Sequence, residues 1–314
     1  MYIGVGGKAR LCYSAELEKV GMAENLSDER RTVAASVGNY ALFAGGIGHG
    51  SFIDRAHDAV DAYSASLTKS MPTALSTVRY RHAGASVEGY ALFAGGADGQ
   101  RTVDIVDSVD AYSASLTRTA AATLSGERVW MGAASLEGRA FFAGGASSNM
   151  NSDNKCANVE VYNSTLTRTA ATNLSVARYY PLTATIGSRV LFAGGTGNTI
   201  TKVVDVYSTS LTRTAAADLS RPTSGDASTV VGNYAIFTSD GNTSCDVYNA
   251  SLTKTTVTLL SVARVNMSAG TVGDYALFAG GGTNSPYSDV VDACDTSLTR
   301  TTVTTLDLSL IHIS

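Results

Sequence analysis

The sequence predicts an all-β fold that is built from repeated four-stranded antiparallel sheets. Three observations support this prediction. A Phe-Ala-Gly-Gly tetrapeptide recurs along most of the chain, a Tyr precedes a Ser-Leu-Thr-like segment in most repeats, and the two markers keep a constant separation. Tandem copies at a fixed period indicate one supersecondary unit that is repeated and packs against its own copies.

The two markers define the repeat. Each Tyr stands 30 residues before the next Phe, as Tyr63 and Phe93 do, whereas 11 to 20 residues separate a Phe from the marker that follows it. A segment of fixed length must pack, and a segment of variable length is a surface loop. The Phe marker stands at Phe43, Phe93, Phe142, Phe192, Phe278 and, in a degenerate copy, Phe237. The Tyr marker stands at Tyr13, Tyr63, Tyr112, Tyr162, Tyr207 and Tyr248, with Cys294 in the last copy.

The elements follow in order within each repeat. Residues 34–37 have small side chains and predict a first strand, and the apolar run 40–44 is typical of a strand that is buried on both faces. The linker Gly38-Asn39 between them contains Gly, which supplies the positive φ of a two-residue hairpin. We expect a third strand over 59–63. A fourth strand is expected in the Thr- and Ala-rich segment, which is 119–123 in the following repeat.

Four-stranded units of 41–50 residues are the blades of β-propellers. The small first strand suits the inner position, where blades converge. The Thr-rich fourth strand suits the outer edge, where polar residues discourage pairing with another chain. Six complete blades are expected over 27–75, 76–124, 125–174, 175–219, 220–260 and 261–306.

Residues 1–26 hold the last three strands of a further blade, so we expect residues 1–307 to form one propeller domain of seven blades. The first blade would lack its inner strand, which would be supplied beyond Asp307. Six blades with an N-terminal fragment are the alternative. Residues 308–314 break the Thr-rich pattern and resemble the translation of a sequencing-library adapter, so we expect no functional role for His312.

The hairpin that ends in Gly-Gly, followed by Val-x-x-Tyr, resembles the kelch repeat. This blade occurs in kelch proteins and in the central domain of galactose oxidase, and the resemblance covers almost the whole chain. It implies a kelch-like β-propeller of the uncharacterised bacterial or phage-associated type. The chain departs from the pattern in two ways: Ser-Leu-Thr-Arg/Lys replaces the Trp that usually follows the Tyr, and Ser239-Asp240 replaces one Gly-Gly pair.

Composition narrows the possible partners. Only 16% of the 314 residues are charged, and 23 basic residues against 27 acidic ones give a net charge of −4. Because the chain has no basic excess and no basic run, we expect no nucleic-acid partner. No apolar run approaches the ~20 residues of a membrane span, so we expect no membrane partner. The N-terminus has no charged start followed by an apolar stretch, so we expect no signal peptide, and the cellular location is left open.

We expect no cofactor and no metal. The four cysteines, Cys12, Cys156, Cys245 and Cys294, lack the spacing of a zinc site and are expected to be buried free thiols. No Gly-x-Ser-x-Gly, phosphate-binding loop or His-Glu-x-x-His motif occurs. Copper oxidases of the galactose-oxidase type need two His, two Tyr and a cross-linking Cys, a set that cannot be assigned in this sequence. A non-catalytic protein is therefore favoured over an enzyme.

Candidate binding residues lie in two kinds of connection. The segments between second and third strands vary in length and sequence, and the first of them contains His49, Asp54 and His57. These variable segments are 47–58, 97–106, 146–158, 196–203, 239–244 and 282–289. The connections from a fourth strand to the next first strand share a Leu-Ser-x-x-Arg frame. This frame places an arginine at Arg30, Arg79, Arg128, Arg178 and Arg264.

The frame arginines have two interpretations. They bond carbonyls or acids between blades, or they form a ring of guanidinium groups for an anionic ligand. The residues after each Arg differ between repeats, which suits a ligand site and would also result from drift. The variable residues in question are Arg81, His82, Trp130, Tyr179, Tyr180 and Asn266. Trp130, Tyr179 and Tyr180 are suited either to stack on a sugar ring or to pack between blades.

The sequence thus predicts a non-catalytic binding or scaffold module that presents variable loops on one propeller face to a protein or glycan ligand. Two alternatives stay open. One is a glycan-active enzyme or copper oxidase of the galactose-oxidase type. The other is a structural repeat segment of a larger phage or cell-surface appendage.

Overall fold

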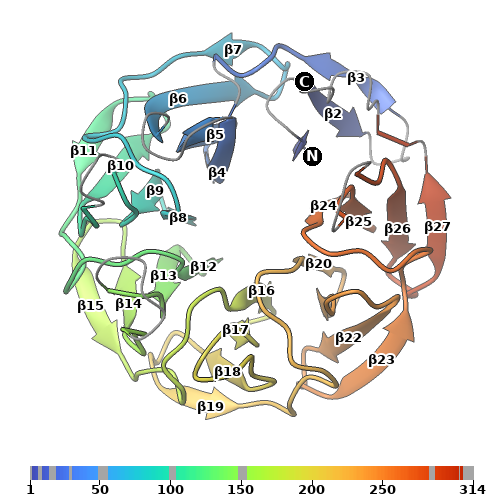
Figure 1. Ribbon diagram of the computed structural model, residues 1–314. Helices are drawn as coiled ribbons and strands as arrows, with labels where there is room; N and C mark the ends of the chain where they lie inside the picture. The colour runs from blue at the N-terminus through green and yellow to red at the C-terminus, as the bar shows by residue number, and fades with distance from the viewer. Residues whose placement is uncertain are drawn as a thin grey trace. The chain divides into compact units, whose positions relative to one another are not determined.

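The computed structural model describes residues 2–5, 9–13, 19–27, 30–48, 56–98, 104–147, 154–282, 287–303 and 305–306. Within these residues the chain forms strands, turns and loops and no helix, so none of this part offers a helix able to cross a membrane. Six antiparallel sheets have four strands each, and a further sheet has three (Figure 1). The all-β propeller fold with four-stranded antiparallel blades is therefore confirmed.

The chain divides into two compact units, of which the second comprises Glu24–Tyr180 and Tyr207–Arg213. Three four-stranded blades lie in this unit, and in each one the strands pair in chain order. The first blade consists of β4 (Arg30–Val37), β5 (Tyr40–Gly48), β6 (Ala56–Ser64) and β7 (Lys69–Ser70). The second consists of β8 (Ala83–Val87), β9 (Tyr90–Ala94), β10 (Val109–Ser113) and β11 (Arg118–Ala120). The third consists of β12 (Gly132–Leu136), β13 (Arg139–Ala143), β14 (Val159–Tyr162) and β15 (Arg168–Ala171).

The first unit comprises Met1–Ala23, Pro181–Val206 and Thr214–Ser314. It holds most of one four-stranded blade and all of two others. These blades are β16 (Leu182–Ile186), β17 (Arg189–Ala193), β18 (Val204–Tyr207) and β19 (Arg213–Ala215); β20 (Ser228–Val231), β21 (Tyr234–Phe237), β22 (Ser244–Asn249) and β23 (Lys254–Thr258); and β24 (Ser268–Val272), β25 (Tyr275–Ala279), β26 (Val291–Asp295) and β27 (Arg300–Val303).

The N-terminal sheet has three strands, β1 (Tyr2–Val5), β2 (Ala9–Tyr13) and β3 (Lys19–Ala23). β1 lies against β24, the first strand of a blade in the same unit. In the second unit, β9 lies in the same way against β4, the first strand of the preceding blade. β1 therefore takes the place of a second strand, as expected for a blade without its inner strand. The sequence left two blade numbers open, seven and six. The part of the chain that the structure describes has six four-stranded blades, and a seventh complete blade stays a prediction.

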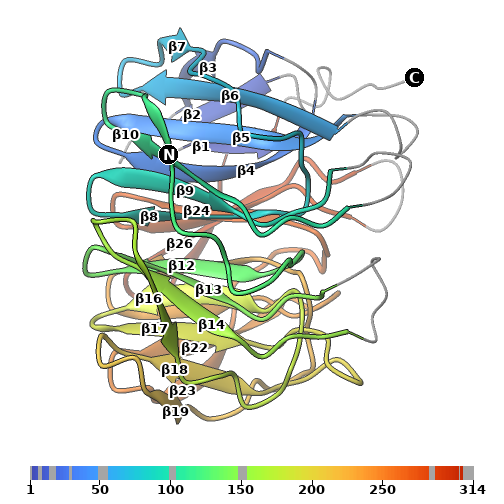
Figure 2. The ribbon, with the colours of Figure 1, turned by 90° about the vertical axis from the view of Figure 1, so that its left-hand side faces the viewer.

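The hairpins between first and second strands form as the glycine-containing linkers predict. Gly38 has a φ of 53°, and Val37 pairs with Tyr40 on either side of the turn. β5 and β6 are the long paired strands of the first blade in the second unit (Figure 2). The fourth strand is shorter than expected: β11 begins at Arg118 and ends at Ala120, whereas the sequence favoured 119–123.

The hydrophobic core lies between consecutive blades. One cluster joins Leu92 and Val109 of the β8–β11 blade to Phe142 and Tyr162 of the β12–β15 blade. Marker Phe and Tyr side chains also meet within blades, edge to face, with ring centroids 5.7–5.9 Å apart. The hydroxyls of Tyr63, Tyr112 and Tyr248 then donate to carbonyls near the end of the preceding repeat, as Tyr112 does to Thr73 at 2.9 Å. The fixed 30-residue spacing thus reflects packing on both sides of the blade interface.

The Gly-Gly pair forms the main-chain link between consecutive blades. The N–H of Gly46 donates to the carbonyl oxygen of Arg79 in the next repeat at 2.8 Å, and Gly145 bonds to Arg178 in the same way at 2.9 Å. Gly144, with a φ of 68°, lies so close that an added Cβ would stand 2.3 Å from the Arg178 oxygen. Both the positive φ and the close approach therefore require Gly at this position.

The Leu of each Ser-Leu-Thr turn also adopts the left-handed conformation. Leu116 and Leu166 have φ values of 61° and 59°. The cost of this conformation for a residue with a Cβ is offset by packing, because each Leu side chain contacts the core cluster shared with the preceding blade. These turns contribute to the blade interface as well as joining the third and fourth strands.

Candidate functional site

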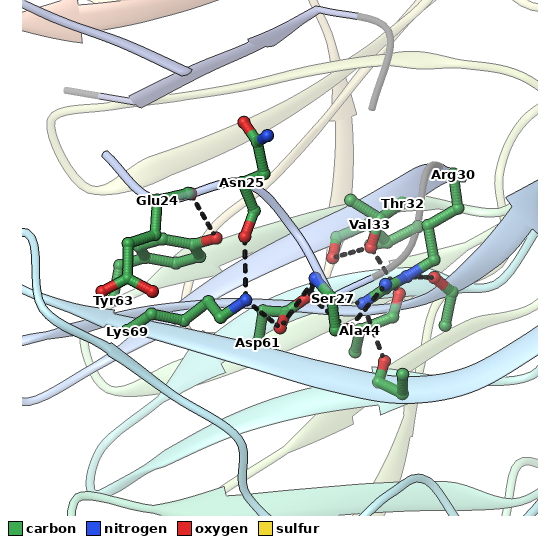
Figure 3. Close-up of polar contacts among 12 residues, drawn as sticks. Glu24, Asn25, Ser27, Arg30, Thr32, Val33, Ala44, Asp61, Tyr63 and Lys69 are labelled. Atoms are coloured by element: carbon green, nitrogen blue, oxygen red, sulfur yellow. Dashed lines mark hydrogen bonds and ion pairs between the residues drawn. The ribbon is translucent and has the colours of Figure 1, made fainter. Parts of the chain in front are cut away.

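The frame arginines are held by buried carboxylates. In the first blade of the second unit, Arg30 Nη2 lies 2.9 Å from Asp61 Oδ2, and both side chains are fully buried. Arg30 also donates from Nε to the carbonyl oxygen of Gly45 at 2.8 Å. The other Asp61 contacts come from the N–H and hydroxyl of Ser27 and from the Lys69 ammonium (Figure 3). The carboxylate therefore joins the frame Ser and Arg to the start of the fourth strand.

The same arrangement recurs in other blades. Arg79 and Arg118 both pair with Asp110, and Arg264 and Arg300 both pair with Asp292. Arg128 and Arg168 pair with Glu160. Buried and paired in this way, Arg79, Arg128 and Arg264 serve the blades themselves, which favours the structural interpretation of the frame. Arg178 is buried as well.

The carboxylates were missed in the sequence although a signal for them exists. Asp61, Asp110 and Glu160 each stand two residues before the marker Tyr of their repeat, as does Asp246. In the repeat of Asp246 the frame Arg is replaced by Thr223, and Asp246 instead accepts hydrogen bonds from Ser220 and Thr256. An Asp or Glu at a fixed offset, next to a recurring Arg, is the pattern from which the ion pair could have been inferred.

Two residues after the frame position the backbone is left-handed in five repeats, but not at Thr32, which follows Arg30. Arg81, Trp130 and Tyr180 have φ values of 58°, 60° and 52° in the second unit. The equivalent residues of the first unit, Gly225 and Asn266, have φ values of 71° and 56°. Nothing in the sequence indicated this conformation, because Arg, Trp and Tyr rarely adopt it.

Main-chain hydrogen bonds connect these left-handed residues in the second unit. The N–H of Trp130 donates to the carbonyl oxygen of Arg81, and the N–H of Tyr180 donates to the carbonyl oxygen of Trp130, both at 3.0 Å. Three residues that are about fifty positions apart in the chain are thus fixed side by side. Their side chains are placed by backbone contacts that do not depend on side-chain identity.

The side chains of these residues form an aromatic cluster, which consists of Tyr80, Arg81, Trp130, Tyr179 and Tyr180. The Trp130 ring centroid lies 5.2 Å from that of Tyr179 and 5.4 Å from that of Tyr180. The Arg81 guanidinium carbon stands 4.7 Å from the Trp130 centroid and 4.9 Å from that of Tyr80. These separations fit aromatic and cation–π contact.

The cluster reaches the surface. Tyr180 is 40% exposed, Trp130, Tyr179 and Arg81 are half-buried, and Tyr80 is buried beneath them. Burial raises the pKa of the Tyr180 hydroxyl, so this group stays protonated and able to donate a hydrogen bond at neutral pH. The sequence named four of these five residues. The structure brings those four together and adds the buried Tyr80, whose ring contacts the Arg81 guanidinium.

The other predicted site residues are not part of the aromatic cluster, and two of them lie outside the described residues. His82 is buried, and its burial together with the Arg79 charge lowers the imidazole pKa to about 3, so it is neutral at physiological pH. His57 is half-buried in β6. His49 and Asp54 lie outside the described residues. Asn266 stands at the left-handed position of a connection in the first unit.

The described residues contain no group of three or more His, Cys, Asp or Glu side chains that is suited to hold a metal. Cys245 and Cys294 are buried free thiols, and burial raises the pKa of each to about 12. Cys156 is half-buried rather than buried, which differs from the expectation. The side chain of Cys12 lies outside what the structure describes.

The variable segments between second and third strands are described in part. The segments 196–203 and 239–244 are described throughout, and the other four only at their ends. In 239–244 the N–H of Asn242 donates to the Ser239 carbonyl at 3.0 Å, which closes a short turn. The shortest of these segments is therefore a compact turn held by its own backbone.

A scan against protein-family models and a search of the curated proteins give no match. Among solved structures the chain is similar to one titled "Structure of YjhT", with a TM-score of 0.67 and 12% sequence identity. The match covers 88% of this chain and 97% of the other. At this identity the similarity concerns the fold alone. The six four-stranded blades and this similarity together establish a β-propeller, a fold that suits a binding or scaffold module.

Proposed function

We propose that this propeller is a non-catalytic carbohydrate-binding module whose aromatic cluster contacts the sugar. The observation that carries the proposal is the grouping of Trp130, Tyr179 and Tyr180 at the surface, with ring centroids 5.2–5.4 Å apart. Aromatic rings with one polar tip suit a ligand that has both apolar faces and hydroxyl groups. A pyranose ring has this character.

The surroundings of the cluster support an uncharged, hydroxyl-rich ligand. Charged residues make up only 16% of the chain, and the frame arginines Arg79 and Arg128 are paired with carboxylates. Binding sites for small ligands are lined mainly by apolar and aromatic side chains with a few polar groups that fix orientation. Here the Tyr180 hydroxyl and the Arg81 guanidinium are the polar groups beside the rings. We include the variable loops between second and third strands in the proposal as additional contacts for the ligand.

Rigid display is the mechanism that we propose. The ligand-contacting residues stand on short connections whose backbones are hydrogen-bonded to each other, so little ordering is needed when a ligand binds. Because the entropic cost of fixing mobile groups is avoided, a modest contact area can give useful affinity. The Trp130 and Tyr180 backbones provide this order through their hydrogen bonds.

Trp130 is the only tryptophan of the chain, so its fluorescence reports on the cluster directly. Oligosaccharides from cellulose, xylan, starch and chitin are titrated one at a time, and emission is recorded. We expect a saturable shift in emission with at least one of them, and its loss in Tyr179→Ala. The control is Tyr287→Ala, an exposed tyrosine of the first unit that should leave binding unchanged. Flat titrations with every sugar, together with a protein partner that Trp130→Ala releases, would show a protein-binding module instead.

A further inference from the structure

The left-handed position of the interblade connection lies close to buried residues on both sides in the chain. Two residues before it stands the frame Arg, which is buried in all described repeats that have it. One residue after it, His82, Met131 and Met267 are buried, and Asp226 is half-buried. Between these flanking positions the left-handed residue is half-buried or exposed. It is therefore the outward-facing residue of a connection whose flanks are fixed.

The backbone of the connection does not require a large side chain at this position. A residue with a Cβ pays a conformational cost at positive φ that Gly does not pay. Gly225 occupies the equivalent place in the first unit with a φ of 71°, so the connection forms with Gly. Arg81 and Tyr180 nevertheless keep long side chains at φ values of 58° and 52°.

The leucines of the Ser-Leu-Thr turns provide a comparison. Leu116 and Leu166 also have positive φ, but every described copy of this position is a Leu, and both side chains pack on the core of the preceding blade. The left-handed position of the connections instead carries Arg, Trp, Tyr, Gly and Asn. A strained position with one constant apolar residue serves packing. A strained position with five different residues and an exposed side chain serves recognition.

We propose that this left-handed residue is the specificity-determining position of the module, and that Arg81, Trp130 and Tyr180 of the second unit each contribute one side chain to the ligand. In the second unit Arg81, Trp130 and Tyr180 form a row across three consecutive connections. Their main-chain hydrogen bonds keep the row in place whatever side chains it carries. The inference rests on the proposed carbohydrate-binding function and assigns ligand selection within it to these three residues of the second unit.

The test compares stability and binding in variants that retain the Trp130 reporter. Tyr180→Gly and Arg81→Gly remove the side chain and relieve the backbone. The control is Val176→Ala in the same connection, because Val176 is 38% exposed and Tyr180 is 40% exposed, but Val176 is not at the left-handed position. Melting temperature and oligosaccharide affinity are measured for each protein.

We expect Tyr180→Gly and Arg81→Gly to melt at or above the wild-type temperature and to bind the sugar about tenfold more weakly, whereas Val176→Ala keeps wild-type affinity. A lower melting temperature with unchanged affinity would show a structural role and overturn the inference. Unchanged values of both would also overturn it. If the wild-type protein binds no sugar at all, the proposed function fails first, and the assignment of ligand selection falls with it.

Discussion

Arg30 and Asp61 form an ion pair of 2.9 Å in which both side chains are fully buried. Asp61 also accepts hydrogen bonds from the N–H and hydroxyl of Ser27, so three donors meet at one carboxylate. A carboxylate in this position links the start of a blade to its third strand. The Ser and Arg of the Leu-Ser-x-x-Arg frame thus share a third partner, the carboxylate of Asp61.

Removing this carboxylate should destabilise the protein strongly. Asp61→Asn leaves the Arg30 guanidinium buried without a counter-charge, which typically costs about 3–5 kcal/mol. Urea unfolding at neutral pH measures the change. Asp58→Asn on the same strand β6 is the control, since Asp58 is only half-buried, and it should cost less than about 1 kcal/mol. Equal effects of the two variants would contradict a special role for the pair.

His82 should make the protein less stable in acid. Its imidazole pKa is lowered to about 3 from the usual 6.5, first by burial and then by the Arg79 charge. The unfolded state therefore binds a proton more readily than the folded state. The free energy of unfolding is therefore unaffected by this group above pH 6.5, and it decreases as pH falls from 6.5 toward 3.

Comparison of the wild type with His82→Met isolates this effect, because Met131 and Met267 occupy the equivalent place in other blades. We expect the stability difference between the two proteins to shift in favour of the variant as pH drops from 7 to 4.5. Denaturant unfolding at both pH values measures it. A pH-independent difference would mean that the imidazole is not buried in the neutral form.

Asp226 should have the opposite pH dependence. It stands at the position equivalent to His82, and burial raises its pKa to about 6. The folded state then binds the proton more readily than the unfolded state. The contribution of protonated Asp226 to the free energy of unfolding is present in acid and is lost as pH rises through 6.

Asp226→Asn removes this penalty at neutral pH. We expect the variant to be more stable than the wild type at pH 7.5 and to lose that advantage near pH 4. Thermal melting across the pH range follows the difference. Asp274→Asn is a suitable control, since Asp274 is exposed in a hairpin turn and should show no such trend. An Asp226→Asn protein that is less stable at every pH would contradict the raised pKa.

The Gly-Gly links should not accept alanine. Gly144→Ala places a Cβ 2.3 Å from the Arg178 carbonyl oxygen at a φ of 68°, and the clash adds to a conformational cost of about 1–2 kcal/mol. Gly89→Ala should show that conformational cost alone, because its φ is 84° and no atom lies within 4 Å of the added Cβ. Gly126→Ala, at an open position without positive φ, should be nearly neutral. Any other order of the three melting temperatures would argue against the link.

The repeat allowed the fold to be predicted from the sequence, but it allowed only part of the candidate site to be predicted. The constant distance between Tyr63 and Phe93 predicted strands that were then found in place, because one interface is used again in every blade. The Asp61 partner of Arg30 could have been found from its constant offset to Tyr63. The left-handed conformation of Trp130 could not, because Trp has no local preference for it and its backbone partner, Arg81, belongs to another connection.

The link from Gly195 to Thr223 shows how tolerant the blade interface is. This repeat has lost its frame Arg, yet the N–H of Gly195 still donates to the Thr223 carbonyl at 2.8 Å, because the acceptor belongs to the main chain. This joint therefore does not depend on the side chain of the acceptor residue. Duplication or deletion of a whole repeat in the gene would therefore produce a joint that is already functional, so that copies can be gained, lost and diversified without a matching change in the neighbouring repeat.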